Sequence, residues 1–177
     1  DKVAGGDAAI GWHQDNFFIV NPPEGEEENL DKYWNQFGHV HVRPAEIDWR
    51  EDYLKKTIIV RINVDPQTVE NGAMAVIPGS YQEGPLELRE DGEEYIKQHE
   101  SEAVVCTAGE GSVSFYFPGM LHSSFPSVAP VGTHRRAAAH RVRAASLQLP
   151  GWKWPTDWEG GIHQIKAESG FDLNPFM

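Results

Sequence analysis

The sequence has a single cysteine and no long apolar run, and each absence narrows what the protein can be. Cys106 is alone among 177 residues, so the chain has no internal disulfide and no cysteine-rich zinc site. No apolar stretch reaches the roughly 18 residues that a membrane span needs, and no apolar segment follows a charged start as in a signal peptide. We therefore predict an intracellular, cytoplasmic protein without a membrane span; an organelle address could still precede Asp1.

Basic residues are scarce relative to acidic ones. Lysine and arginine number 15 against 27 aspartates and glutamates, which gives a net charge of −12. Such a charge repels nucleic-acid phosphates and anionic membrane surfaces, so we expect a small-molecule substrate and no nucleic acid as partner. The acidic excess lies in residues 24–31 and 83–102, whereas residues 135–143 are basic and suit either an anionic ligand or a solvated strand edge. The sequence carries no signal of an oligomeric state.

Long helical patterns are also missing. Residues 57–64 are almost continuously apolar and β-branched, which predicts a central strand. Shorter strands joined by glycine and proline turns are predicted over residues 10–20, 73–77, 103–107, 112–117 and 136–149. Residues 118–122 read as a turn leading into a loop, residues 30–36 as one helical turn, and residues 83–102 as a solvated loop or exposed helix. Short strands without strand–helix alternation indicate an all-β barrel or sandwich, in which Cys106 is expected in a buried strand.

His13 and Asp15 form a candidate metal-binding pair. In an extended chain, residues two apart project to the same face, so an imidazole nitrogen and a carboxylate oxygen can meet at one point. Two histidines and one carboxylate on one side of an Fe(II) ion leave positions open for a chelating co-substrate and O₂. The third ligand must come from elsewhere, and such a pair is more often a hydrogen-bonded surface pair. His39 and His41 have no carboxylate in register and are interpreted as surface or substrate-side histidines.

Four segments closely resemble, in order and in type, the phytanoyl-CoA dioxygenase family. They are Gly-Trp-His-Gln-Asp at 11–15, Glu-Asn-Gly-Ala-Met-Ala-Val-Ile-Pro-Gly-Ser-Tyr at 70–81, the stretch from 111–115 to 121–123, and Arg-Arg-Ala at 135–137. This resemblance, over residues 11–143, implies a double-stranded β-helix (a jelly-roll, cupin-like core) with irregular insertions and few short helices. It also implies that His13, Asp15 and His122 are the catalytic iron ligands, with Fe(II), 2-oxoglutarate and O₂ as cofactor and co-substrates.

The resemblance further implies an arginine, beyond the distal histidine, that pairs with the remote carboxylate of 2-oxoglutarate. A planar guanidinium suits a carboxylate better than an ammonium does. Thr133 stands where the family usually has this arginine, so a short insertion in the preceding loop is expected. Arg135 and Arg136 alternate faces on a strand, so only one can point inward. We assign the cofactor-binding role to Arg135, with Arg136 as the alternative.

The reaction that the resemblance implies is hydroxylation of an unactivated C–H bond in a small organic or acyl substrate, with release of succinate and CO₂. Asp15 fills the position that a halide would need, which argues against a halogenase. Two alternatives stay open, a catalytically inactive jelly-roll binding module and a cupin-type metal enzyme that does not use 2-oxoglutarate.

Residues 1–177 are expected to form a single jelly-roll oxygenase domain that lacks the family's usual N-terminal segment. Residues 21–56 are interpreted as an insertion that could serve as a substrate-side lid. Its aromatic residues are candidates for lining a substrate pocket: Trp34, Phe37, Trp49 and Tyr53.

Overall fold

The structure is a computed structural model that describes residues 3–4, 9–16, 18–20, 34–36, 39–42, 54–86, 89–144 and 146–147, the three segments between 18 and 42 by their backbone only. The contacts divide the chain into two compact units. One comprises residues 1–16 and 48–147, and the other comprises residues 17–47 and 148–177. The single domain over residues 1–177 and the lid role of residues 21–56 stay predictions.

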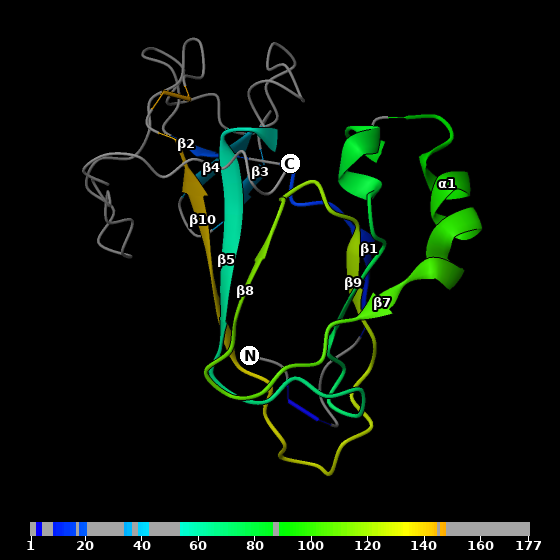
Figure 1. Ribbon diagram of the computed structural model, residues 1–177, viewed down its shortest axis with the longest axis vertical. Coiled ribbons are helices and arrows are strands. Elements are labelled where there is room, and N and C mark those ends of the chain that lie inside the picture. Colours follow the sequence, from blue (N-terminus) through cyan, green and yellow to red (C-terminus); the bar gives the residue numbers. More distant parts are fainter. Residues whose placement is uncertain are drawn as a thin grey trace. The chain divides into compact units, whose positions relative to one another are not determined.

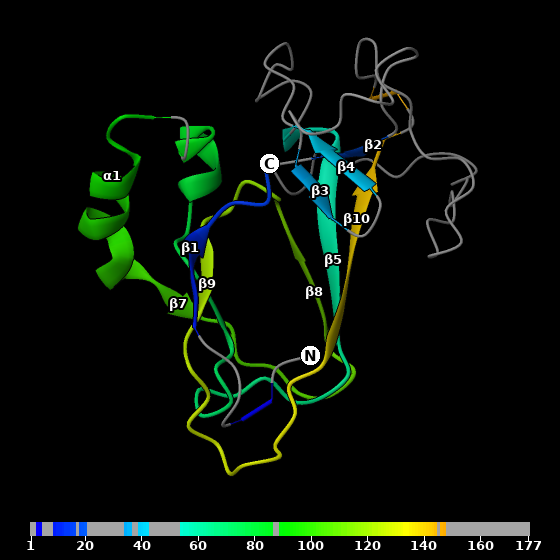
Figure 2. The same ribbon diagram turned by 180° about the vertical axis from the view of Figure 1, so that it is seen from behind.

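The first unit contains two antiparallel sheets that face each other (Figures 1 and 2). One has the strand order β10-β5-β8, from β5 (Thr57–Asn63), β8 (Val113–Tyr116) and β10 (Ala137–Arg143). The other has the order β1-β9-β6-β7, from β1 (Ile10–His13), β6 (Met74–Val76), β7 (Val104–Val105) and β9 (His122–Ser124). Facing antiparallel sheets are the arrangement of a jelly roll, so the predicted all-β fold class is confirmed.

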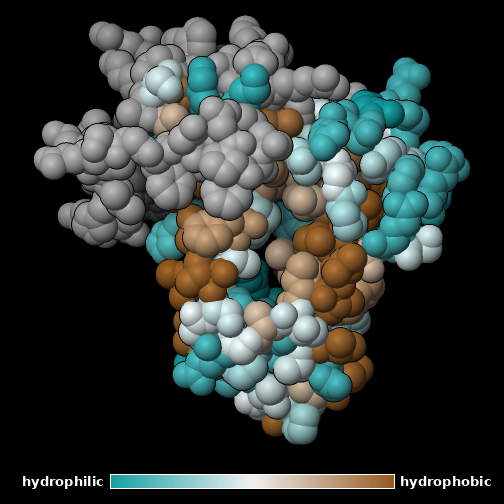
Figure 3. All heavy atoms as spheres, viewed as in Figure 1, coloured by the Kyte–Doolittle hydropathy of each residue, from teal (hydrophilic) through white to brown (hydrophobic). Residues whose placement is uncertain are grey.

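The strand β5 is the centre of its sheet, as its sequence predicts. It pairs with β10 along its whole length and with β8 over four residues. Thr57, Ile59 and Asn63 are buried on the face toward the other sheet, and Arg61 shares that face by alternation. Apolar side chains gather on the opposite face, over β5 and β8 (Figure 3), where Phe115 is 63% exposed. The outward face of the strand is therefore apolar (Ile58, Val60 and Ile62), whereas its inward face carries Ile59 beside three polar residues.

Tight turns connect the strands at the predicted glycines. Gly72 has a φ of 71° just before β6, and Gly79 has a φ of 80° where the 3₁₀ helix η3 (Ser80–Glu83) begins. The Asn71 side chain accepts a hydrogen bond from the Thr68 N–H at 2.9 Å and donates one to the Pro66 carbonyl at 2.8 Å. The contacts of Asn71 and the positive φ of Gly72 thus shape a turn just before β6.

One α-helix, α1 (Gly92–His99), crosses the outside of the four-stranded sheet in the described part of the chain and is followed by the 3₁₀ helix η5 (Glu100–Glu102) (Figure 1). Glu93 and Glu94 occupy its first turn and Lys97 and His99 its last, which complements the helix dipole. Tyr95 and Ile96 pack on a buried cluster that also includes Leu121. The exposed helix predicted within residues 83–102 is confirmed, and its apolar side supports the residue that precedes His122.

The described part of the second unit is a three-stranded antiparallel sheet of order β2-β4-β3, from β2 (Phe18–Val20), β3 (Trp34–Gln36) and β4 (His39–Val42). The helical turn expected at residues 30–36 was wrong, because residues 34–36 pair with β4 as a strand. The predicted pocket-lining side chains of this segment lie outside the described residues, namely Trp34, Phe37, Trp49 and Tyr53.

Two predictions near the two-sheet core were also wrong. Cys106 lies just beyond β7 and is only partly buried, although that burial still raises the pKa of its thiol. Residues 122–124 form the strand β9, where a loop was expected. The three residues have no alternation of apolar and polar side chains, and they form a strand because they pair with β1 on one side and β6 on the other. None of the helices in the described part of the chain has the length and apolar character that crossing a bilayer requires.

Candidate metal centre

His13 and His122, far apart in sequence, are brought together by the pairing of β1 with β9. The two residues are direct partners in the antiparallel register, and the register shifts between Ile10 and His13. Their rings lie with centroids 4.1 Å apart at an interplanar angle of 50°. A cross-strand pair at this distance places both imidazoles on the same face of the sheet.

Asp15 completes the group from the segment that follows β1. Its Oδ1 lies 3.8 Å from His13 Nε2 and its Oδ2 lies 3.8 Å from His122 Nε2. The three candidate ligand atoms lie within 4.8 Å of one another. The Asp15 backbone is held on both sides, because its N–H donates to the Pro118 carbonyl at 2.9 Å and its carbonyl accepts from Arg141 Nη2 at 2.8 Å. The carboxylate therefore faces both imidazoles from a fixed main chain.

Each histidine presents Nε2 to the centre because its Nδ1 is held by a backbone carbonyl. His13 Nδ1 lies 2.9 Å from the Gly11 carbonyl oxygen, and His122 Nδ1 lies 2.9 Å from the Met120 carbonyl oxygen. A carbonyl oxygen only accepts, so each Nδ1 must carry the proton and donate. Each Nε2 then keeps a lone pair directed at the point that the Asp15 carboxylate faces, which is the state that metal coordination requires.

The centre is buried on one side and open on the other. The His122 side chain is 9% exposed, whereas those of Asp15 and His13 are 24% and 41% exposed. Burial lowers the pKa of His122, although the neighbouring Asp15 carboxylate opposes this effect. The neutral imidazole is therefore favoured at His122, and a ligand can approach from the side of His13.

Two buried side chains that sequence reasoning missed position the candidate ligands. Gln14 donates to the Gly84 and Gly119 carbonyls at 3.0 and 2.6 Å and accepts from the Leu86 N–H at 2.8 Å. Ser80 donates to the Ile77 carbonyl at 2.7 Å and accepts from the N–H of Leu121, the neighbour of His122, at 2.8 Å. Gln14 points away from the metal-binding face, as extended geometry predicts. Gln14 lies in the motif at residues 11–15 and Ser80 in the motif at residues 70–81, so the family motifs were the sequence signal that could have identified them.

The two adjacent arginines have opposite environments. Arg135 is 7% exposed, and it donates from Nη1 to Gln67 Oε1 at 3.1 Å and from Nη2 to Ser124 Oγ at 2.9 Å. The Arg136 side chain is 55% exposed and forms a two-point ion pair with Asp65, from Nε at 2.8 Å and Nη2 at 2.8 Å. Only Arg135 points inward, in agreement with the alternation expected of a strand.

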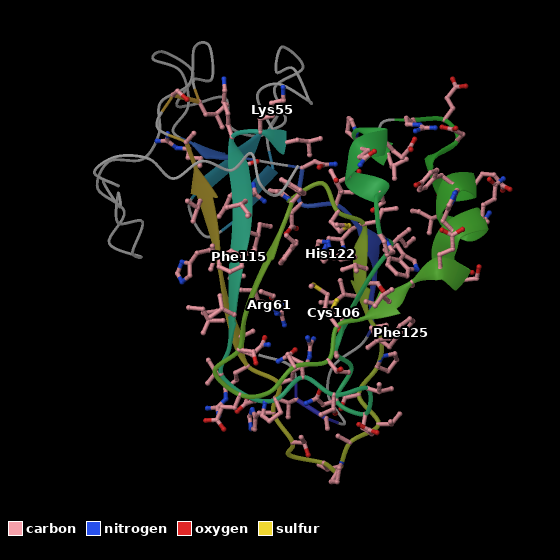
Figure 4. All side chains as sticks on the ribbon, viewed as in Figure 1. Lys55, Arg61, Cys106, Phe115, His122 and Phe125 are labelled. Atoms are coloured by element: carbon pink, nitrogen blue, oxygen red, sulfur yellow. The ribbon has the colours of Figure 1, made fainter. Side chains whose placement is uncertain are left out.

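The inner face of the three-stranded sheet adds an aromatic ring and two further cations to this region. Tyr116 on β8 lies with its ring centroid 5.7 Å from that of His122. Burial and the Asp15 carboxylate raise the pKa of Tyr116 to about 12, and the charges of Arg61 and Arg141 oppose this rise. Figure 4 shows Arg61, Cys106 and His122 directed into the space between the two sheets. Sequence reasoning placed Arg61 on a strand and did not assign it a role.

The other candidate residues are not members of this group of ligands. His39 and His41 are on β4 in the second unit, and their side chains lie outside the described residues. His140 is an exposed residue of β10, and Arg143 on the same strand has its pKa lowered by burial. Among the described residues, His13, Asp15 and His122 are the group with metal-ligand spacing.

Solved structures of other proteins resemble this chain in fold. The chain resembles EctD from S. alaskensis, solved with 2-oxoglutarate and 5-hydroxyectoine, at 20% identity and a TM-score of 0.50, over 84% of this chain and 43% of that one. It also resembles EvdMO1, at 16% identity and a TM-score of 0.50, over 82% of this chain and 25% of that one. The chain thus spans less than half the length of either structure, and at these identities the likeness concerns the fold.

No curated protein matches the sequence. The model of the phytanoyl-CoA dioxygenase (PhyH) family matches residues 2–137, which include His13, Asp15 and His122 as well as both candidate arginines. This match covers most of the chain, so the chain belongs to the phytanoyl-CoA dioxygenase family.

Proposed function

We propose that the protein is an Fe(II)- and 2-oxoglutarate-dependent dioxygenase that hydroxylates an unactivated C–H bond of a small organic or acyl substrate. Succinate and CO₂ are the co-products. The observation that carries this proposal is the geometry of His13, Asp15 and His122, with two Nε2 lone pairs and one carboxylate directed at a common point. Two histidines and one carboxylate with open positions are the ligand set typical of non-haem Fe(II) oxygenases.

The three side chains that would hold Fe(II) differ in how deeply they are buried. His122, buried on β9, supplies a neutral imidazole whose orientation the Met120 carbonyl fixes. His13 and Asp15 lie at the open side, where the co-substrate and the substrate would arrive. Bound iron supplies the activation of O₂ that oxidises both 2-oxoglutarate and the substrate. The protein's own contribution is to fix the ligands and to keep the coordinating nitrogens deprotonated.

Arg135 is the proposed partner of the remote carboxylate of 2-oxoglutarate. Its guanidinium is buried and bonded to Ser124, which lies two residues beyond His122 on the same strand and therefore on the same face. Arg136 is engaged by Asp65 at the surface, so its environment does not favour the alternative assignment. EctD, which is similar in fold, was solved with 2-oxoglutarate.

Anaerobic addition of Fe(II) and 2-oxoglutarate tests the proposal directly. A 2-oxo acid that chelates iron at such a site gives a weak visible charge-transfer band, and we expect that band here. A folded, iron-loaded sample without the band would favour a cupin-type metal enzyme that does not use 2-oxoglutarate. A folded sample that binds neither iron nor 2-oxoglutarate would favour an inactive binding module.

Replacing His122 with Ala should abolish iron-dependent succinate formation, because one of three ligands is lost. His140→Ala is the matched control, since His140 is exposed on β10 and should keep wild-type activity. Succinate release, measured alongside the circular dichroism of each variant, separates loss of the ligand from loss of the fold. Undiminished turnover in a folded H122A protein would place the third ligand elsewhere.

A further inference from the structure

Arg61 is a cation between the two sheets whose polar contacts are neutral. Its Nη2 donates to Gln67 Oε1 at 3.2 Å and its Nε lies 3.4 Å from Asn63 Oδ1. It also hydrogen-bonds the side chain of Tyr116 on the neighbouring strand. Within the described part of the chain, no carboxylate forms an ion pair with Arg61. A partly buried guanidinium that is held only by neutral groups is suited to receiving an anion.

Gln67 connects Arg61 to Arg135. Its side-chain oxygen accepts from Arg61 Nη2 at 3.2 Å and from Arg135 Nη1 at 3.1 Å, so both guanidinium groups contact one atom. Gln67 is 3% exposed, and its backbone bonds Ala108 in both directions at 2.7 and 3.0 Å, which fixes the amide in place. Two like charges are thus held together in the interior by a neutral dipole, an arrangement that a carboxylate would stabilise further.

This pair of guanidiniums lies next to the candidate metal centre. Ser124 binds Arg135 and follows His122 by two residues on β9, a step of about 6.6 Å along a strand. Tyr116 approaches both Arg61 and the His122 ring, and the charge of Arg61 is one of the causes that lower the pKa of His122. The surface is hollowed between the sheets, with hydrophilic residues deep in the hollow (Figure 3). The two-residue step from His122 to Ser124, about 6.6 Å, is comparable with the length of a five-carbon dicarboxylate.

We propose that Arg61 and Arg135, joined through the Gln67 side-chain oxygen, form one carboxylate-binding site whose ligand is the remote carboxylate of 2-oxoglutarate. Arg61 is thereby a second cationic contact for the co-substrate, in addition to the arginine that the family resemblance assigns. This inference rests on the function proposed above. Two guanidiniums give the site a preference for dicarboxylate 2-oxo acids over 2-oxo acids that lack the remote carboxylate.

The first test compares 2-oxoglutarate with 2-oxopentanoate, which has the same chain length and no remote carboxylate. Calorimetric titration of the anaerobic Fe(II)-loaded protein measures both affinities without turnover. Arg61→Gln should weaken 2-oxoglutarate binding about tenfold or more, because a charge-assisted contact is lost, and should leave 2-oxopentanoate binding unchanged. Arg61→Lys keeps the positive charge but lacks the planar guanidinium, so its affinity for 2-oxoglutarate should lie between those of the wild type and of the R61Q protein. Arg136→Gln is the matched control and should bind 2-oxoglutarate as the wild type does.

The second test places a carboxylate inside the site. Gln67→Glu is nearly isosteric and puts a negative charge between Arg61 and Arg135, so it should raise the melting temperature while weakening 2-oxoglutarate binding about tenfold or more. A purely structural role of Gln67 does not produce these two opposite changes together. This variant also covers the case in which Arg61→Gln does not fold.

The outcomes separate the inference from the function on which it rests. Wild-type protein that binds iron but neither 2-oxo acid would overturn the proposed function. Wild-type protein that binds 2-oxoglutarate, together with R61Q and Q67E proteins of unchanged affinity, would overturn the two-arginine site and leave the function standing. Equal weakening of 2-oxoglutarate and 2-oxopentanoate in R61Q would also overturn it, because the effect would then not depend on the remote carboxylate.

Discussion

At the scale of single residues, the adjacent arginines Arg135 and Arg136 have different environments, because successive residues of an extended chain point to opposite faces. Arg135 enters the interior and contacts neutral oxygens of Gln67 and Ser124. Arg136 stays at the surface and receives its countercharge from Asp65, whose Oδ2 also accepts the Arg136 backbone N–H at 2.7 Å. The surface arginine therefore ties the loop after β5 to the start of β10, whereas the interior arginine lies on the side where a ligand anion is proposed to bind.

The Asp65–Arg136 pair predicts a specific loss of stability in acid. Hydrogen bonds from Arg136 hold the pKa of Asp65 well below its usual value of 3.8 in the folded state. The unfolded chain then binds the proton more readily, so the contribution is present above about pH 4 and is lost as the pH falls toward the folded-state pKa. Acid unfolding of Asp65→Asn and Arg136→Gln, followed by circular dichroism, should begin at a higher pH than in the wild type. Wild-type acid profiles in both variants would contradict the pair's role.

At the scale of elements, the centre depends on how β1 and its following segment are attached to the rest of the core. Gln14 stands between two candidate ligands and reaches away from them to the segments after η3 and before β9. Asn16 donates a hydrogen bond to the Gln14 side-chain oxygen at 2.9 Å, and the Leu86 N–H donates to the same oxygen. The hydrogen bonds of one buried amide thus fix the segment that carries His13 and Asp15.

Gln14→Leu should therefore destabilise the fold by roughly 3 kcal/mol or more, because buried carbonyls and the Leu86 N–H lose their partner. Metal affinity should fall about tenfold or more as the ligand positions relax. Gln98→Leu is the matched control, since Gln98 is an exposed residue of α1 that hydrogen-bonds Glu94 on the same helix. Urea unfolding and a metal titration check the two effects, and stability equal to that of the control would contradict them.

The sequence predicted elements with strong local patterns and missed those that pairing creates. Six of the eight residues 57–64 are β-branched, so β5 was evident, as were glycine turns such as those at Gly72 and Gly79. The strand β9 has three residues, and both of its neighbours come from distant segments, so no local pattern marks it.

For the candidate site, the motifs indicated which residues to bring together, and the structure adds how they meet. The spacing of His13 and Asp15 predicts a shared face, but their distance from His122 follows only from the register of β1 against β9. The convergence of Arg61 and Arg135 on one Gln67 oxygen could not be predicted, because no local sequence pattern marks which side chains will share an acceptor.

At the scale of the molecule, charge is unevenly distributed between surface and interior. The acidic residues that the structure describes within residues 83–102 are exposed, whereas the guanidiniums of Arg61 (Figure 4), Arg135 and Arg141 lie between the sheets or against the centre. Positive charges in the interior favour the entry of an anion once it reaches the opening, despite the net charge of −12. The acidic surface alone would have argued against an anionic co-substrate.

Metal binding should stabilise the whole fold, because the ligands are assembled only in the folded chain. At a free metal concentration 100 times the dissociation constant, the expected gain is about 2.7 kcal/mol. The melting temperature of the wild type should rise with added Fe(II), or with Mn(II) as a redox-stable substitute, and fall again with a chelator. His13→Ala should lose this response, and a response that persists in it would place the metal elsewhere.

The position of β1 at the edge of its sheet has a consequence for motion. Among the strands that the structure describes, β1 pairs with β9 and has no second neighbour, yet it ends at His13. A metal ion shared by His13, Asp15 and His122 would act as a cross-link between the edge strand and its inner neighbour. Backbone amides of residues 10–13 should then exchange with deuterium faster in the metal-free protein, while those of β5 exchange equally slowly in both forms. An edge that opens and closes with occupancy would make assembly of the centre the last step in folding of this sheet.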